Sequence, residues 1–355
     1  MLLLLLLFLS CEKEAEDDPF YSKTLIVYMA ADNDLSSDAG KNIEQIIEGC
    51  RLLSKDNNVV IYIDSRNDQP SVFQIRSGRK ILQKTYSDHN SATPEVMESV
   101  LTDIVHTNPS LSYSLILWSH GTSWLPENAS LRSFGKEKSR EIDIIDLEKS
   151  LPVHFDLILF DACLMGSVEV AFQLKEKTDY IIASPAQIIV DGFPYDKIMN
   201  LFFGDEQTYR QIVEEYYLYY SGLDGAWKSA IAALIKTDEL ENLAVLTLDI
   251  ISSYPLDKWN YNEKSVQLLD PGLPVYHDFY DFLKKNYPAS LLDRLDKQLE
   301  KVVLYKITTN KILDEISIRE FCGFSSYIPN PDYPLLNEYY KKLSWCHQSG
   351  YHLLF

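Results

Sequence analysis

The stretch LILFDACLMG, residues 157–166, decides most of what can be expected of this chain. Its first four residues form an apolar run typical of a buried strand, and Cys163 follows shortly after that run. The stretch LILWSHG, residues 115–121, repeats the pattern and brings His120 to its end. In an open parallel α/β sheet the active crevice lies outside the carboxyl ends of the strands, so both side chains are expected at one edge. A cysteine and a histidine there form the minimal nucleophile and base of a cysteine hydrolase.

Each of these two residues also has a structural interpretation. A cysteine after a buried strand is more often an inert small hydrophobic residue, and a lone histidine is often a hydrogen-bonded loop residue. The two motifs together favour catalysis. Cysteine attacks as the thiolate, so Cys163 needs a base nearby, and His120 is its natural partner. The backbone N–H groups of Gly121 and Cys163 are then the candidates for an oxyanion hole.

The composition narrows the class of function. The chain has 355 residues, with 52 acidic against 33 basic side chains and a formal net charge of −19. Nucleic-acid binding needs a basic surface, so the charge argues against that function. The acidity fits a soluble exported protein or one with cationic substrates.

The N-terminus predicts export. Residues 1–9 form an apolar run that is too short to span a bilayer and is typical of the core of a signal peptide. Ser10 and Cys11 follow, which resembles the lipobox of bacterial lipoproteins and predicts a lipid anchor on Cys11 in the cell envelope. The alternative is a plain secretory signal with an incidental cysteine. The acidic tract at residues 12–18 is interpreted as a flexible tether, similar to tracts that direct some outer-membrane lipoproteins to the cell surface.

Other hydrolase classes lack their motifs. The sequence has no HExxH zinc motif and no GxSxG nucleophile elbow, and its seven histidines do not cluster. No CxxC pair occurs, which argues against a zinc ribbon or a thioredoxin-like motif, and no residue is assigned as a metal ligand. The scattered cysteines do not suggest a disulfide framework, and Cys163 is predicted to be a free thiol.

Strand and helix signals alternate over the first half of the chain, which predicts an α/β fold with a mostly parallel sheet and helices on both faces. Residues 196–300 are mainly helical, and the tyrosine-rich run at 216–220 is interpreted as a packed helix face. Strands return at 302–307 and 323–328. The strands expected before residue 195 are 25–30, 59–64, 72–75, 80–85, 115–118, 157–160 and 180–183, and the helices are 35–53, 94–106, 143–150 and 167–175.

The two strand ends carry a family resemblance. Ser119-His120-Gly121 and Asp161-Ala162-Cys163 resemble the His-Gly and Ala-Cys motifs of the clostripain family of cysteine peptidases, in the clan of caspases, legumain, gingipains and separase. Weaker similarities at 183–195, 229–232 and 323–329 extend the resemblance over most of the chain.

The resemblance implies a caspase-like fold and a division of the chain. Residues 1–22 are the signal, lipobox and tether, and residues 23–195 are the catalytic core. Residues 196–355 are then a mainly helical C-terminal region whose late strands complete the core.

The resemblance also implies an activity, which is endopeptidase cleavage after Arg or Lys in peptides or proteins. Cys163 forms a thioester, His120 protonates the leaving amine, and no cofactor is required. A pocket for a basic side chain needs a carboxylate, for which Asp161 is the first candidate and Asp191 the second. The alternatives are that Asp161 caps backbone N–H groups at the strand end and that Asp191 serves the turn before Gly192.

The chain departs from the family pattern beside the histidine. The family has a glycine-rich stretch there, whereas this chain has Thr122 and Ser123, and Ala232 replaces the family's aspartate. Bulkier residues would narrow the cleft beside the base. A second hypothesis therefore stays open, in which the chain is a catalytically inactive relative that acts as a binding module.

Two regulatory hypotheses concern single segments. Charge predicts a solvated loop at residues 122–140, while the family's activation by cleavage in such a loop is the alternative. The loop's basic residues are Arg132, Lys136, Lys138 and Arg140. Calcium activation, which occurs in parts of the family, is left open for Asp32, Asp34 and Asp38, although their spacing is no EF-hand.

Overall fold

The computed structural model describes residues 20–126, 134–138, 140–270, 272 and 274–355. The expected signal peptide, the lipidation candidate Cys11 and the acidic tether lie outside the described residues, as does Arg132.

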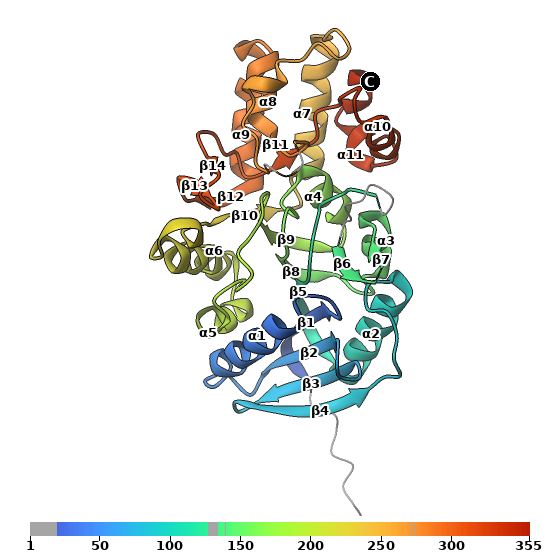
Figure 1. Ribbon diagram of the computed structural model, residues 1–355, viewed down its shortest axis with the longest axis vertical. Coiled ribbons are helices and arrows are strands. Elements are labelled where there is room, and N and C mark those ends of the chain that lie inside the picture. Colours follow the sequence, from blue (N-terminus) through green and yellow to red (C-terminus); the bar gives the residue numbers. More distant parts are fainter. Residues whose placement is uncertain (1–19, 127–133, 139, 271, 273) are drawn as a thin grey trace, which may run out of the picture.

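The fold is built on one sheet of nine strands (Figure 1). Its centre is parallel, with β9, β8, β5, β1 and β2 side by side in this order. The antiparallel strands β10 and β12 extend one edge, and the hairpin β3–β4 extends the other. The expected α/β class with a mostly parallel sheet is confirmed. The strands of this sheet are β1 (Tyr21–Ala31), β2 (Asn57–Ser65), β3 (Ser71–Arg76), β4 (Arg79–Thr85), β5 (Ser110–Trp118), β8 (Phe155–Asp161), β9 (Thr178–Ala183), β10 (Ile231–Lys236) and β12 (Val303–Thr308).

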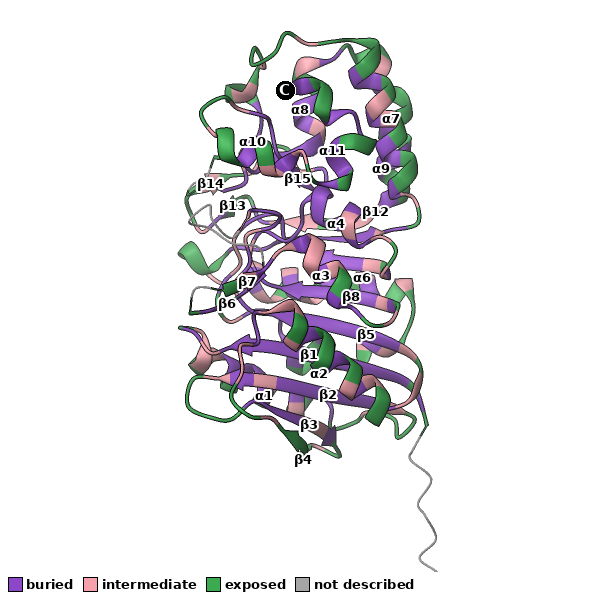
Figure 2. Ribbon diagram, turned by 90° about the vertical axis from the view of Figure 1, so that its right-hand side faces the viewer, coloured by how far each residue is buried: buried purple, intermediate pink, exposed green. Residues whose placement is uncertain are grey.

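Helices cover both faces of the sheet, because alternate residues of each central strand are apolar on either side. In β1, Leu25 and Val27 pack on one face, and Ile26 and Tyr28 pack on the other. The first face is covered by α1, α5 and α6, and the second by α2, α3, α4 and α7. Figure 2 shows central strands buried along their length between helices that are buried on one side. These helices are α1 (Ser36–Gly49), α2 (Pro94–Thr107), α3 (Ile144–Ser150), α4 (Val168–Leu174), α5 (Tyr195–Ile198), α6 (Glu206–Ser221) and α7 (Leu240–Ser253).

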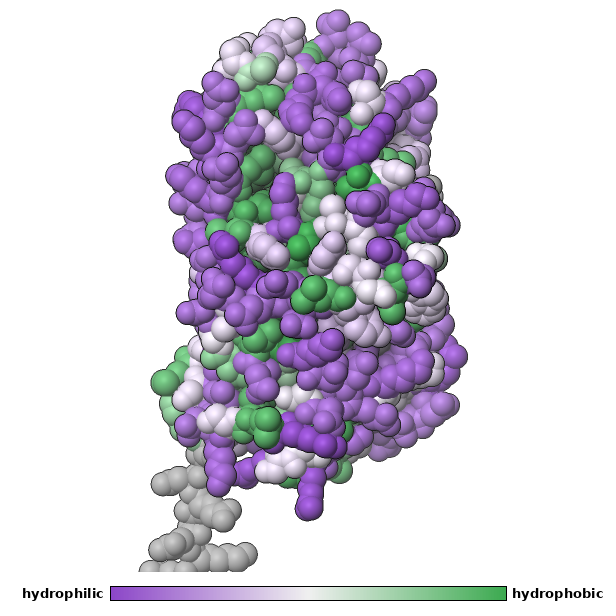
Figure 3. Space-filling view, turned by 90° about the vertical axis from the view of Figure 1, so that its left-hand side faces the viewer, coloured by the Kyte–Doolittle hydropathy of each residue, from purple (hydrophilic) through white to green (hydrophobic). Residues whose placement is uncertain are grey.

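The outer surface is largely polar. On the face seen in Figure 3, hydrophilic side chains predominate and apolar ones show between them. Among the described residues, no helix combines the length and the apolar content needed to cross a membrane.

Local capping fixes where helices begin near the candidate site. Asp143 caps α3 by accepting a hydrogen bond from the N–H of Ile145 at 2.7 Å. Ser167 caps α4 by accepting one from the N–H of Val170 at 3.2 Å. The loop that carries Cys163 therefore runs from the end of β8 directly into a capped helix.

The segment 196–300 is less uniformly helical than expected. β10 lies within it and joins the main sheet between β9 and β12. A short apolar run does not distinguish a buried strand from a buried helix, so the mainly helical expectation for this segment did not include β10. Tyr216 and Tyr220 of α6 are buried against the sheet, so the tyrosine run packs as a helix face, as expected.

Two further expectations, one of a strand and one of a loop, need correction. Of the expected strand 323–328, only Ser325 and Ser326 form a strand, β15 (Ser325–Ser326), which pairs with β11 (His277–Asp278) outside the main sheet. The loop 122–140 is not simply solvated, because β6 (Phe134–Glu137) pairs with β7 (Arg140–Ile142) and both ends of β6 are buried. A short hairpin lies apart from the main sheet and consists of two strands of two residues each, β13 (Lys311–Ile312) and β14 (Ile316–Ser317).

The C-terminal helices gather at the end of the molecule beyond α4 and β12 (Figure 1). One link between these helices and the core is Glu169 of α4, which is almost fully buried. Its Oε1 accepts hydrogen bonds from the Tyr340 hydroxyl at 2.7 Å and from the Tyr327 N–H at 3.0 Å. Burial raises the pKa of this carboxyl. The helices are α8 (Phe279–Asn286), α9 (Asp293–Val302), α10 (Pro334–Tyr340) and α11 (Ser344–Gln348).

This attachment predicts a stability loss. Glu169→Ala is expected to lower the free energy of unfolding by about 2–4 kcal/mol, because it leaves the Tyr340 hydroxyl and the Tyr327 N–H buried without an acceptor. Glu169→Gln keeps an acceptor and should lose less. Glu176→Ala is the matched control, since Glu176 makes an exposed pair with Lys175 at 2.9 Å, and it should lose less than about 1 kcal/mol. Urea unfolding measures all three variants. Equal losses at the two positions would show that the buried carboxyl does not attach the C-terminal region.

Candidate active site

The register of two neighbouring strands brings His120 and Cys163 to one edge. Trp118 of β5 pairs with Asp161 of β8 in a parallel ladder, and each candidate residue follows two positions later. The two loops are in backbone contact there. A Cβ atom at Gly121 would lie 2.6 Å from the carbonyl oxygen of Cys163, so no larger residue fits without movement. The structure therefore places the two motifs side by side at the carboxyl edge of the sheet.

The loop that carries Cys163 is tied to the segment after β9. The N–H of Leu164 donates to the carbonyl of Ala186 at 2.9 Å, and the N–H of Gly166 donates to the carbonyl of Ser184 at 2.7 Å. Leu164 has a φ of +66°, a left-handed conformation that is rare for a leucine. Such backbone conformations persist where surrounding contacts enforce them, and they cluster at functional sites.

Cys163 is a free, half-buried thiol, as predicted. Its Sγ lies 3.4 Å from the backbone nitrogen of Ile188, whose N–H donates to it. Burial raises the pKa of this thiol to about 11, and the hydrogen bond from Ile188 opposes that rise. At pH 7 a thiol with this pKa is ionised in roughly one molecule in ten thousand. The resting nucleophile is therefore a thiol that has to lose its proton during the attack.

His120 is held by a residue that the sequence interpretation did not assign to the site. Its Nε2 lies 3.0 Å from Oδ1 of Asp34, which follows β1. The hydrogen bond from His120 lowers the pKa of the Asp34 carboxyl, so the carboxylate accepts and Nε2 carries the proton. Nδ1 is then the nitrogen that can accept a proton. No hydrogen bond joins His120 and Cys163 within the described part of the chain, and such bonds often form only when substrate is bound.

The candidate oxyanion hole keeps its donors available. The backbone N–H groups of Gly121 and Cys163 lie in the two contacting loops, and neither donates to a backbone carbonyl among the residues that the structure describes, while the Cys163 N–H approaches its own thiol. Two N–H groups at the end of a parallel strand pair are the arrangement that stabilises a developing oxyanion.

Asp161 is buried at the end of β8. Its side chain is 3% exposed, and Oδ2 accepts hydrogen bonds from the Tyr195 hydroxyl at 2.5 Å and the Phe193 N–H at 3.4 Å. Burial raises the pKa of this carboxyl to about 6. The N–H of Phe193 fits the alternative in which Asp161 caps backbone groups at the strand end, and the hydroxyl of Tyr195 at the start of α5 adds a side-chain donor. Direct contact of Asp161 with substrate stays a prediction.

Asp191 lies in the turn above Asp161. It is half-buried, and no side-chain hydrogen bond or ion pair is found for it among the described residues. The next residue, Gly192, has a φ of +68°, so the expected turn is present. The carbonyl of Asp191 accepts a hydrogen bond from Nδ2 of Asn42 at 3.0 Å, and Oδ1 of Asn42 accepts one from Nε1 of Trp118 at 2.8 Å. Asn42, on α1, therefore links the β5 end to this turn, and no sequence motif indicated it.

The calcium hypothesis finds no ligand set here. Calcium takes six to eight oxygen ligands, usually from several carboxylates. Asp34 binds His120, and Asp38 binds Lys41 at 2.7 Å. Within the described ranges, no three His, Cys, Asp or Glu side chains are grouped so as to hold a metal ion. These residues do not fit a calcium site, and calcium dependence stays a prediction.

The basic loop after Gly121 returns to the site through β6. The Lys136 ammonium lies 4.0 Å from Oδ1 of Asp34, and the Lys136 carbonyl accepts a hydrogen bond from Nδ2 of Asn33 at 2.8 Å. Glu137 is buried and accepts from the N–H of Ser91 at 2.7 Å. These contacts explain why the segment is ordered beside His120. Residues 127–133 lie outside the described ranges, so self-cleavage in this loop stays a prediction.

Comparison with known proteins gives a consistent result. Residues 27–330 match the model of the clostripain family. Clostripain of Hathewaya histolytica is 25% identical over 160 residues, which span 42% of this chain and 30% of clostripain. The match therefore covers less than a third of that relative's length.

Two solved structures are similar over nearly the whole chain. The X-ray structure of an inactive zymogen C11 protease from Parabacteroides distasonis has a TM-score of 0.83 and 32% identity, and the match covers 93% of this chain and 98% of that one. A secreted C11 cysteine protease from Bacteroides thetaiotaomicron, in complex with an irreversible peptide inhibitor, has a TM-score of 0.84 and 28% identity, with 93% and 99% covered. These matches confirm the fold that the resemblance implied.

The raised pKa of Cys163 predicts how its alkylation depends on pH. The rate of modification by iodoacetamide should rise about tenfold per pH unit from pH 6 to pH 10 without a plateau, since the thiolate fraction does so below a pKa of about 11. Peptide-level mass spectrometry separates Cys163 from the buried Cys50, Cys322 and Cys346. A plateau below pH 8 would instead indicate a thiolate already present at rest.

Proposed function

Since the chain belongs to the clostripain family of cysteine peptidases, we propose that it is an endopeptidase that cleaves after Arg or Lys, with Cys163 as nucleophile and His120 as proton carrier. The observation that supports this most is the pairing of Trp118 with Asp161, which sets a thiol and an imidazole at adjacent strand ends.

The steps follow from the positions of these groups. Substrate entry brings the scissile carbonyl over Sγ of Cys163, whose proton passes to Nδ1 of His120 as the C–S bond forms. The N–H groups of Gly121 and Cys163 stabilise the oxyanion. His120 gives the proton to the leaving nitrogen, the C–N bond breaks, and water then hydrolyses the thioester and restores the thiol. Asp34 accepts from Nε2 throughout and stabilises the imidazolium that forms between these steps.

A preference for basic residues is supported by the acids on the acyl side of Cys163. The carboxylate of Asp191 has no partner among the described residues, so it is available to a guanidinium or an ammonium group. Asp161 supports the same turn from below through Tyr195 and Phe193. The family resemblance of the Asp161–Cys163 motif points the same way.

The runner-up is a catalytically silent binding module with the same fold. Two observations favour it: the thiol is protonated at rest, and one similar structure is described as an inactive zymogen. Covalent labelling distinguishes the two hypotheses, because only a working site reacts with a peptide acyloxymethylketone.

Export is proposed with a lipid anchor on Cys11. The apolar run at residues 1–9 and the Ser10-Cys11 pair support it, and one similar protease is described as secreted. The anchor would place the protease in the cell envelope, facing peptide or protein substrates.

A fluorogenic peptide panel that varies the residue before the scissile bond tests the proposed specificity. Hydrolysis should be at least about a hundredfold faster after Arg or Lys than after Ala or Glu, because a basic side chain pairs with the half-buried carboxylate of Asp191 and other residues leave that carboxylate unpaired. Cys163→Ala should abolish hydrolysis, and an Arg or Lys acyloxymethylketone should label Cys163. Activity that peaks at acidic or apolar residues would contradict the basic pocket.

Asp34 is predicted to be a positioning residue that acts through His120. Asp34→Ala should lower kcat about 10- to 100-fold with little change in KM, and Asp34→Asn should recover part of the loss because its amide oxygen still accepts from Nε2. Asp238→Asn is the control, since Asp238 also follows a strand of the sheet but pairs with Lys236 at 3.0 Å and does not contact His120. Equal activity of the Ala and Asn variants, or a change in KM alone, would rule out this role.

A further inference from the structure

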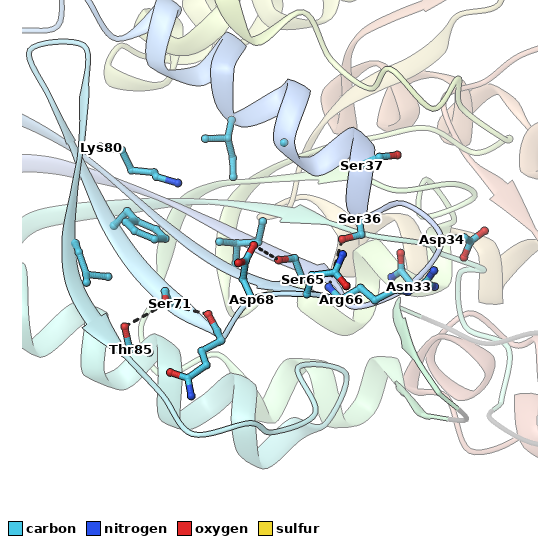
Figure 4. A pocket seen from close by; sticks show the side chains of 17 residues that line it. Asn33, Asp34, Ser36, Ser37, Ser65, Arg66, Asp68, Ser71, Lys80 and Thr85 are labelled. Atoms are coloured by element: carbon cyan, nitrogen blue, oxygen red, sulfur yellow. Dashed lines mark hydrogen bonds between the residues drawn. The ribbon is translucent and has the colours of Figure 1, made fainter.

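A cavity of about 830 Å³ lies beside the candidate site (Figure 4). It is enclosed by α1, by the segments that follow β1 and β2, and by the hairpin β3–β4. Figure 4 shows Asp34 at one end of the cavity and Lys80 at the other, with Arg66 and Ser36 near the Asp34 end. None of the residues assigned above to the nucleophile, the oxyanion hole or the basic pocket lines it.

The cavity begins where the catalytic groups end. Asp34, which lines it, is the residue that accepts the hydrogen bond from His120 at 3.0 Å. The sheet order β8-β5-β1-β2 places Cys163, His120, Asp34 and Arg66 after successive strands along one edge. A chain that crosses this edge from Cys163 past His120 therefore enters the cavity next.

The direction of a bound substrate follows from the proton transfer, so this step rests on the proposed function. His120 delivers its proton to the leaving nitrogen, and the imidazole therefore stands on the leaving-group side of the scissile bond. The acyl side then lies toward β9, where Asp191 is found. We propose that the cavity binds the part of the substrate that follows the scissile bond, and that Arg66 there selects an acidic side chain.

Charge supports an acidic ligand. Arg66 and Lys80 make no ion pair with a carboxylate within 4.0 Å among the described residues, and the Lys80 ammonium lies 4.3 Å from the Phe73 ring centroid. Of the acids that line the cavity, Asp34 is engaged by His120, which leaves Asp68. Two unpaired cations stand out in a chain with a net charge of −19, and complementary charge is what such a cavity selects.

The distance sets which residue of the substrate reaches Arg66. Neighbouring strands lie about 4.8 Å apart, so the end of β2 is about 14 Å from the end of β8, which Cys163 follows. An extended peptide advances about 3.3 Å per residue, and the fourth residue after the scissile bond therefore arrives at Arg66. The apolar side chains of Ile43, Ile63 and Phe73 form the wall beyond it.

The test uses peptides that share one acyl half ending in Arg and carry Glu, Ala or Lys as the fourth residue after the scissile bond. Binding to full-length Cys163→Ala is measured by fluorescence anisotropy, and kcat/KM is measured with the unmodified chain. Glu is expected to bind about fivefold better than Ala, and Lys about fivefold worse, as for partly exposed ion pairs. Arg66→Ala should remove the preference and Arg66→Glu should reverse it. Arg76→Glu, at the exposed far end of β3 and outside the cavity, should leave it unchanged.

Equal binding of the Glu and Lys peptides would overturn the inference, as would a preference that survives Arg66→Glu. Failure of the proposed function is seen separately, with an Arg acyloxymethylketone whose acyloxy leaving group carries no peptide. Absence of labelling at Cys163 together with an Arg66-dependent binding preference would reject the protease and keep the peptide site. Labelling without any preference would keep the protease and reject the site.

Discussion

The alignment of β5 with β8 is the constraint on which the candidate site depends. Trp118 opposite Asp161 means that the two loops leave the sheet at the same height, and side chains in a strand alternate between faces. A slip of one residue would turn either His120 or Cys163 away from the edge. The contact between Gly121 and the Cys163 carbonyl adds a second constraint, because it fixes how closely the two loops approach. The pairing of two buried apolar strands thus determines the relative position of His120 and Cys163, which lie in the loops after those strands.

At this edge of the sheet the catalytic groups are in place, but the nucleophilic thiol is protonated. Burial keeps Cys163 as a thiol, and the carboxylate of Asp34 orients the imidazole of His120 without being in contact with the sulfur. Asp161 contributes from below, as the buried acceptor for the turn that carries Asp191. Asp161 therefore supports the turn from the core, while Asp191 within the turn remains exposed enough to meet a cation. This division of labour follows from burial, since residues of the same type behave differently at different depths.

The sequence carried most of the core and part of the site. Strands such as 157–160 were predictable because burial on both faces produces a continuous apolar run, and Cys163 and His120 were predictable because they directly follow such runs. β10 was missed, since a short apolar run among helices has no distinguishing period. Asp34 and Asn42 were missed as site residues for a different reason. Asp34 acts through one long-range hydrogen bond and Asn42 through two, and a single sequence has no local pattern that reveals such pairs.

The position of α1 has a consequence for how specificity can change. Asn42 on this helix holds the carbonyl of Asp191 on the acyl side, while Ser36, Gly40 and Ile43 of the same helix line the cavity on the opposite side of His120. Because α1 is a rigid helix that contacts both halves of the cleft, a change in its tilt moves residues in both halves. Substitutions that change binding in one half are therefore expected to change binding in the other, so the changes in binding free energy from substitutions in the two halves should not be additive. Specificity for residues before and after the scissile bond would then change together during evolution, because both depend on the position of α1.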